Sequence, residues 1–180
     1  MTTTEAQGPV ALLDLKFQAE RTVAAFLIRT TEGPVLVETG PESLYDHLRE
    51  AVEGEGFALE DIRHVFITHI HLDHGGAAWR LARHGAKIHV HPKGARHLQD
   101  PSKLLDSARR IYGDAMDRLW GRLEPIPADR IVPMEDGETA RLGDVSFHAI
   151  HAPGHAIHEI TYRLEDGLFT GDVGGIRIGD

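Results

Sequence analysis

The stretch Thr68-His69-Ile70-His71-Leu72-Asp73-His74-Gly75-Gly76 carries the strongest signal in the chain. It overlaps the end of His64–Thr68, a short apolar run with β-branched residues that predicts a strand buried on both faces. His69 and His71 stand two residues apart. On an extended backbone leaving that strand, both imidazoles project from one side and can bind one ion. The stretch therefore predicts a metal site at the end of a buried strand.

Asp73 and His74 follow at once, so four potential ligands lie within six residues. A polar loop with exposed histidines would explain any one of them alone, but it does not explain the whole string after a buried strand. Gly75-Gly76 lets the backbone turn tightly towards a following helix. The chain has no cysteine, which excludes thiolate metal sites and cysteine nucleophiles. Nitrogen and oxygen ligands of this kind suit zinc, iron or manganese equally well.

Composition places the chain among soluble globular proteins and predicts one domain over residues 1–180. The net charge is −9 and the longest basic run is Arg109-Arg110. That pattern excludes the electrostatic footprint of a nucleic-acid binder and favours a small-molecule substrate. Met1–Pro9 lacks the features of an export signal, and no apolar stretch approaches the roughly 20 residues of a membrane span. We expect a cytoplasmic protein with no membrane partner, and a homodimer stays open.

Secondary-structure signals surround the histidine stretch on both sides. Upstream, a hairpin and a helix are predicted over Thr22–Ile28, Val35–Val37 and Glu42–Val52. Downstream come a helical pattern from Ala77 to Ala82, a strand over Lys87–Val90 and a short helix over Pro92–Leu98. Strand, helix and strand in this order imply a parallel crossover. From Ile131 on the chain is rich in strand signals, namely Thr139–Leu142, Val145–His151, Glu159–Leu164 and Leu168–Thr170.

Between Asp100 and Leu123 apolar residues recur at helical spacing and predict one or two amphipathic helices. This segment is either a lid or a covering layer. Core packing is the favoured interpretation of its apolar face. The alternative is that the segment lines a substrate entrance through Arg109, Arg110, Tyr112 and Trp120.

Two more candidate ligands follow strands in the second half of the chain. His155 comes after Pro153-Gly154 and Asp172 comes after Gly171, so both are expected at strand ends, where ligands can converge. His151 and His158 flank His155 and are weaker candidates for supporting donors or pocket walls. We interpret the other histidines as surface or packing residues, namely His47, His64, His84, His89, His91, His97 and His148.

With these residues in view, Thr68–Gly76 resembles the signature of the metallo-β-lactamase superfamily, in its glyoxalase II-like form. The resemblance continues, each time after a predicted strand, through Glu38-Thr39-Gly40, Ala152-Pro153-Gly154-His155 and Phe169-Thr170-Gly171-Asp172. It therefore spans nearly the whole chain. It implies an α/β fold, a four-layer αββα sandwich of the metallo-β-lactamase type.

The resemblance also implies a dinuclear site. The first metal would be held by His69, His71 and His155, and the second by Asp73 and His74, with Asp172 bridging both. Zinc is the expected metal, with iron or manganese as alternatives. Where the family has aspartate this chain has Glu38, for which the resemblance implies a supporting contact.

The second metal of the family normally takes another histidine downstream, but no histidine follows His158. Either the chain is a partial form of a longer protein or it holds the second metal weakly. We favour a partial form with an incomplete C-terminal layer, because Gly174–Asp180 offers no helix to finish the sandwich.

The function implied by the resemblance is that of a metal-dependent hydrolase. A water between two cations has its pKa lowered from 15.7 to about 7, and the resulting metal-bound hydroxide attacks an electrophilic centre. Asp73 is the expected catalytic residue, since it can orient that hydroxide. A thioester or a lactone is the favoured ester-like substrate, although fold and motif do not select one. The alternatives are a mononuclear iron dioxygenase acting on sulfur compounds and a metal-binding module without catalysis.

Overall fold

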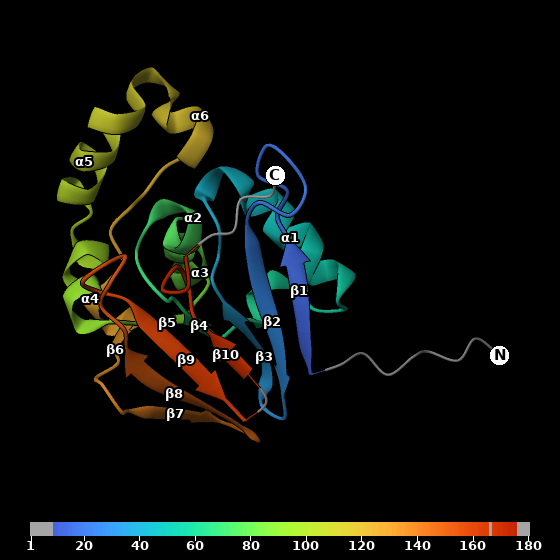
Figure 1. Cartoon of the computed structure of the whole chain (residues 1–180). Helices are drawn as coiled ribbons and strands as arrows, with labels where there is room; N and C mark the ends of the chain where they lie inside the picture. The colour runs from blue at the N-terminus through green and yellow to red at the C-terminus, as the bar shows by residue number, and fades with distance from the viewer. Residues whose placement is uncertain (1–8, 166, 176–180) are drawn as a thin grey trace.

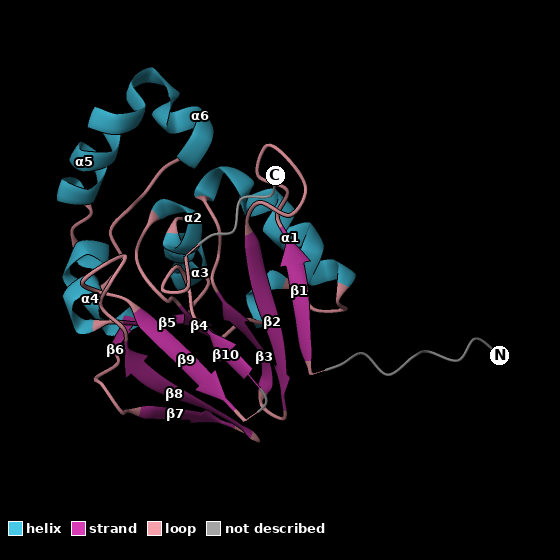
Figure 2. Cartoon of the chain, viewed as in Figure 1, coloured by secondary structure: helices cyan, strands magenta, loops and turns pink. Residues whose placement is uncertain are grey.

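The structure is a computed structural model and describes residues 9–165 and 167–175. These residues form two β-sheets packed face to face, with helices along the outer face of the first sheet (Figure 1). Figure 2 shows the strands gathered on one side of the molecule and the helices on the other. None of the helices in these ranges has the length and apolar character that a bilayer crossing requires.

The first sheet has the strand order β1-β2-β3-β4-β5-β6. Its members are β1 (Val10–Asp14), β2 (Ala24–Thr30), β3 (Gly33–Val37), β4 (His64–Phe66), β5 (Lys87–Val90) and β6 (Ile131–Pro133). The first three strands pair antiparallel, whereas β3, β4, β5 and β6 pair parallel. Parallel neighbours need crossover connections, which here contain the helices of the outer layer. The predicted parallel crossover is therefore confirmed.

The second sheet is antiparallel, in the order β10-β9-β8-β7. Its strands are β7 (Thr139–Leu142), β8 (Val145–His151), β9 (Ile160–Leu164) and β10 (Gly167–Phe169). The bounds of β7 and β8 are those that the sequence predicts. The other two predicted strands are confirmed with shifts of one residue at their ends, which is the usual uncertainty of such boundaries.

The α-helices are α1 (Tyr45–Gly54), α2 (Leu72–Gly75), α3 (Ala78–Arg83), α4 (Pro92–Gln99), α5 (Ser102–Tyr112) and α6 (Met116–Trp120). Short 3₁₀ turns occur at η1 (Glu42–Leu44), η2 (Leu59–Asp61), η3 (Gly113–Ala115) and η4 (Ala128–Arg130). The helix predicted over Glu42–Val52 therefore begins as a 3₁₀ turn. The amphipathic segment after Asp100 forms α5 and α6, which bend over the top of the molecule (Figure 1).

Alternation along β4 shows how the sheets and helices share one strand. Val65 packs into the core between the sheet and the helices, and Phe66 packs into the core between the two sheets. Both side chains are fully buried, as expected for a strand covered on both faces. Phe66 stacks on Phe147 of β8 with ring centroids 4.0 Å apart. The histidine stretch thus begins at the end of a strand that both cores immobilise.

Besides β2 (Ala24–Thr30), which is shifted by two residues from the predicted Thr22–Ile28, two details differ from the sequence-based prediction. Strand β1 was not predicted; it is an edge strand, and its exposed Val10 and Leu12 obscure the alternation that marks a half-buried strand. The predicted strand over His64–Thr68 ends at Phe66, because the Thr68 N–H turns to the Glu38 side chain instead of a neighbouring strand.

The described residues supply the outer helical layer and both sheets of the expected sandwich. Part of the ending on which an incomplete last layer was predicted, Ile176–Asp180, lies outside the described residues.

Candidate metal centre

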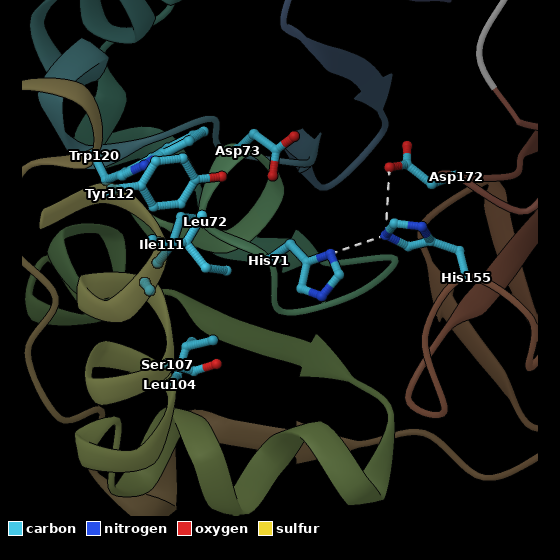
Figure 3. A pocket seen from close by; sticks show the side chains of 11 residues that line it. His71, Leu72, Asp73, Leu104, Ser107, Ile111, Tyr112, Trp120, His155 and Asp172 are labelled. Carbon is cyan, nitrogen blue, oxygen red and sulfur yellow. Dashed lines mark hydrogen bonds and ion pairs between the residues drawn. The ribbon is translucent and has the colours of Figure 1, made fainter. Parts of the chain in front are cut away.

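Loops from both sheets bring the first set of candidate ligands together. His69 and His71 lie in the loop after β4, and His155 lies in the loop between β8 and β9. One ring nitrogen from each of the three falls within 4.8 Å of the others. His155 Nε2 lies 2.9 Å from His71 Nδ1, the contact drawn in Figure 3. The spacing of these nitrogens is compatible with a shared ion.

A second set shares His69 with the first. His69, His74 on α2 and Asp172 after β10 also offer ligand atoms within 4.8 Å of one another. His74 Nε2 lies 3.4 Å from an oxygen of Asp172 and 3.6 Å from an oxygen of Asp73. Asp172 also approaches His155 Nε2 at 3.6 Å, so its carboxylate lies between the two sets. The structure thus brings together all six residues that the sequence singles out, while their role as ligands stays a proposal.

The hydrogen bonds of His69 determine which of its nitrogens is free. Thr68 Oγ1 donates its single proton to the buried carboxylate of Glu38, so it can only accept at its 3.1 Å contact with His69 Nδ1. The Nδ1 atom therefore carries the ring proton, and Nε2 presents a lone pair. That Nε2 atom is buried and has no hydrogen-bond partner among the described residues. A metal ion is the partner that fits an unpaired imidazole lone pair beside two further histidines.

His74 faces the opposite electrostatic environment. Its Nδ1 lies 3.3 Å from Glu38 Oε1, and its Nε2 faces the carboxylates of Asp73 and Asp172. Burial by itself disfavours protonation, but the three carboxylates outweigh it and raise the pKa of His74 to about 9. Burial, together with the neighbouring imidazoles, lowers the pKa of His69 to about 2.

Glu38 contacts Thr68 and His74, next to the candidate ligands, and so makes the kind of supporting contact that the resemblance implies. It is buried and adopts a positive φ of 65°, a conformation that costs a non-glycine residue about 1–2 kcal/mol. The neighbouring Thr39 binds the carbonyl of His74 through both its N–H and its hydroxyl. These two residues attach the end of β3 to the helix that carries His74.

Glu159 is a second buried carboxylate, and the sequence did not reveal it as a site residue. It is fully buried, and its Oε1 accepts the Asp172 N–H at 2.8 Å and lies 3.9 Å from His69 Nδ1. Its other oxygen accepts the N–H of Ala156. Glu159 therefore joins the loops that carry His155 and Asp172. The only signal in the sequence is a carboxylate directly before the buried first half of β9.

Two glycines permit the close approaches that this arrangement needs. A Cβ on Gly76 would lie 2.9 Å from the Pro41 Cα, so its absence lets the chain pass against the start of η1. Gly171 has a φ of 55°, and a Cβ there would lie 2.6 Å from Thr68 Oγ1. Side chains at these two positions would separate the loops that carry the candidate ligands.

The weaker candidates fall in different places. The His158 ring lies 5.8 Å from that of His71, and its buried Nδ1 has no partner among the described residues. His151 instead stacks on His91 and contacts the Met134 carbonyl, away from the candidate ligands. Neither residue belongs to a set that could hold an ion, within the described part of the chain.

Comparison with known proteins identifies the family. The family model described as metallo-β-lactamase superfamily matches residues 19–179. The chain belongs to the metallo-β-lactamase superfamily. A relative from Sulfurisphaera tokodaii, described as a metallo-β-lactamase fold-containing protein, is 31% identical over 121 residues, which are 65% of this chain and 46% of the relative. An acyl-coenzyme A thioesterase of Bos taurus is 28% identical over 162 residues, 82% of this chain and 57% of the relative.

A solved structure of an archaeal metallo-β-lactamase superfamily protein from Sulfolobus tokodaii superimposes with a TM-score of 0.75. It is 22% identical, and the match covers 96% of this chain and 66% of that chain. At this identity the likeness shows the metallo-β-lactamase fold alone, and it confirms the predicted fold class. The chain spans about half the length of the curated relatives it matches.

Metal binding at the His74 set is expected to release a proton. A histidine ligand must be neutral, and a pKa of about 9 keeps His74 protonated at pH 7. Below pH 9 the proton competes with the metal, so apparent Zn²⁺ affinity at this set rises about tenfold per pH unit up to pH 9. Calorimetric Zn²⁺ titration in two buffers of different ionisation enthalpy measures the release. Glu38→Gln removes the principal charge that raises the pKa of His74. The variant is therefore expected to release fewer protons per bound Zn²⁺, and an unchanged number of released protons contradicts the assignment.

Glu159→Gln is expected to weaken Zn²⁺ binding at the set formed by His69, His71 and His155 about 10- to 100-fold while the protein stays folded. The amide cannot accept two backbone N–H groups and keep a negative charge beside His69. Glu165→Gln, the same substitution at an exposed turn, serves as the control and retains parental affinity. The absorption spectrum of the Co²⁺-substituted protein reports ligand geometry directly. A spectrum and affinity equal to those of the parent would show that Glu159 does not position the ligands.

Proposed function

We propose that the chain carries the metal centre of a metal-dependent hydrolase that cleaves an ester-like bond, a thioester or a lactone. The single observation behind the proposal is the buried Nε2 of His69, which has no hydrogen-bond partner among the described residues, in a histidine that shares one compact set of possible ligand atoms with His71 and His155 and another with His74 and Asp172. In this proposal His69, His71 and His155 hold the first divalent cation, Asp73 and His74 hold the second, and Asp172, which approaches both His74 and His155, bridges the two. Zinc is the metal we expect, as in the sequence-based prediction.

Two relatives support the choice of a thioester. The Bos taurus relative is named an acyl-coenzyme A thioesterase, and a relative from Aspergillus novofumigatus, 27% identical over 152 residues, is named an atrochrysone carboxyl ACP thioesterase. Both names specify hydrolysis of an acyl thioester. The transfer of that activity to this chain is part of the proposal.

Bound divalent cations would supply a water acidic enough to act as the nucleophile at neutral pH. The residues of the chain position the attacking water. Asp73 lines the open cavity beside the ligands and its side chain is 39% exposed, so one carboxylate oxygen can accept a hydrogen bond from the attacking water. Water adds its oxygen to the carbonyl carbon, the C–S bond breaks, and the sulfur leaves with one proton. The products are one carboxylic acid and one thiol, and no oxidant is needed.

The direct test is turnover by the purified chain after removal of metal and reconstitution with Zn²⁺. Thioesters, lactones and phosphodiesters are assayed in parallel, and metal content is measured in the same sample. The proposal predicts Zn²⁺-dependent hydrolysis of a thioester or a lactone. Protein purified without added metal that contains one iron and no zinc, and hydrolyses none of the panel, would contradict it and favour the sulfur-compound dioxygenase alternative.

Asp73→Ala is expected to lower kcat about 10²- to 10⁴-fold, the range for loss of a group that positions a transferred proton. Because Asp73 is outside the His69, His71 and His155 set, the variant keeps one Zn²⁺ and a Tm near the parental value. Asp106→Ala, at an exposed position of α5 outside the cavity, is the control and keeps full activity. A kcat for Asp73→Ala within threefold of the parent would rule out the catalytic role.

A further inference from the structure

A cavity of about 340 Å³ opens directly on the candidate ligands. One wall consists of His71, Asp73, His155 and Asp172 (Figure 3). The opposite wall is built by α5 and α6 together with the residue between His71 and Asp73. Its apolar and aromatic members are Leu72, Leu104, Ala108, Ile111, Tyr112 and Trp120. The cavity therefore has a polar end, where the reacting bond would lie, and an apolar end.

The apolar wall packs against the segment that carries His71 and Asp73. Leu72 packs with Ala108 of α5 and Met116 of α6 in a small cluster of buried side chains. Trp120 stacks on Phe17 behind it and meets Tyr112 edge to face, with ring centroids 5.2 and 5.0 Å apart. Because Leu72 stands between two residues of the polar wall, the distance from the apolar end to the ligands is fixed by the chain itself.

Ile111 marks the apolar end as a binding surface. Ile111 is 73% exposed although it lines the same cavity as Leu104 and Tyr112. Full burial of an apolar side chain of this size is worth about 1.5–3 kcal/mol relative to leaving it exposed to water. A ligand with an apolar group in the cavity would cover Ile111.

The charges on the lining exclude one class of ligand. None of the eleven residues that line the cavity is lysine or arginine. The arginines of α5 that the sequence raised as candidates, Arg109 and Arg110, are exposed and do not belong to this lining. A carboxylate at the far end of an acyl chain would have no cationic partner beside α5, and desolvating it there would be costly.

We propose that this cavity holds the apolar, uncharged acyl group of a thioester substrate, with the thioester carbonyl at the polar end. The proposal rests on the hydrolase function proposed above, and it adds the class of acyl group. Tyr112 and Trp120 are the two lining residues that the sequence had raised as candidates for a substrate entrance. The same α5 face serves both core packing and substrate contact, because Ala108 is buried while Ile111 is exposed.

The first test measures binding without turnover. Metal-free protein is titrated with S-ethyl, S-butyl and S-hexyl thioethers of one small thiol, in which a methylene replaces the reactive carbonyl. Fluorescence of Trp120, one of two tryptophans, reports binding; Trp79→Phe removes the other signal. Affinity is expected to rise about threefold to fourfold for each added methylene until the cavity is full. Equal affinities across the series would overturn the proposal.

The second test changes which acyl group is accepted. Ser107 lines the cavity from α5 and is exposed, so Ser107→Lys places a cation at the apolar end without disturbing the core. Parent protein loaded with Zn²⁺ is expected to hydrolyse a butyryl thioester at least tenfold faster, in kcat/KM, than the succinyl thioester of the same thiol. Ser107→Lys is expected to shift that ratio about tenfold towards succinyl, the effect of one charge-assisted hydrogen bond.

Ser102→Lys adds the same charge on the same helix outside the cavity and should leave the ratio unchanged. Equal shifts in both lysine variants would overturn the proposal, because the effect would then be a general effect of charge. If the thioethers bind with the expected length dependence but Zn²⁺-loaded protein hydrolyses no thioester, the proposed hydrolysis is wrong while the assignment of the apolar cavity is upheld.

Discussion

The hydrogen bond from Thr68 to Glu38 is the constraint on which the arrangement of the site depends. It uses the only proton of the Thr68 hydroxyl, so His69 must donate through Nδ1 and turn its Nε2 lone pair towards the other candidate ligands. The same Glu38 carboxylate contacts His74. One buried side chain at the end of β3 thus influences the protonation of two histidines: His69, which is neutral, and His74, whose pKa is raised to about 9.

The fold provides the place where such a carboxylate can be buried. Because β3 and β4 run parallel and are neighbours, the residues that follow them emerge at the same edge of the first sheet. The second sheet brings His155 and Asp172 to this edge through loops that Glu159 joins from within the core. Buried carboxylates therefore lie next to both groups of candidate ligands, and α5 with α6 forms the apolar wall of the cavity that opens on them.

Much of this was predictable because local patterns determine it. The proximity of the candidate ligands in Thr68–Gly76, the strand before them and the β-rich second half follow from residue spacing and turn residues, and most element bounds agree within a few residues. The buried role of Glu159 was not predictable, since a carboxylate at a strand start is ordinarily exposed and only the three-dimensional packing of two loops reveals its partners. The difference between Ala108, which is buried, and Ile111, which is exposed in the same cavity, likewise depends on where α5 lies. The edge strand β1 escaped prediction because its exposed apolar residues break the alternating pattern.

Anomalous diffraction from crystals of the Zn²⁺-loaded protein, recorded on both sides of the zinc absorption edge, tests the central claim most directly. The account predicts a zinc peak bonded to ring nitrogens of His69, His71 and His155 at about 2.0–2.1 Å, with the His69 bond made through Nε2. A peak that omits His69, or one bonded through its Nδ1, would contradict the account, because Thr68 and Glu38 could not then have fixed the proton on that ring.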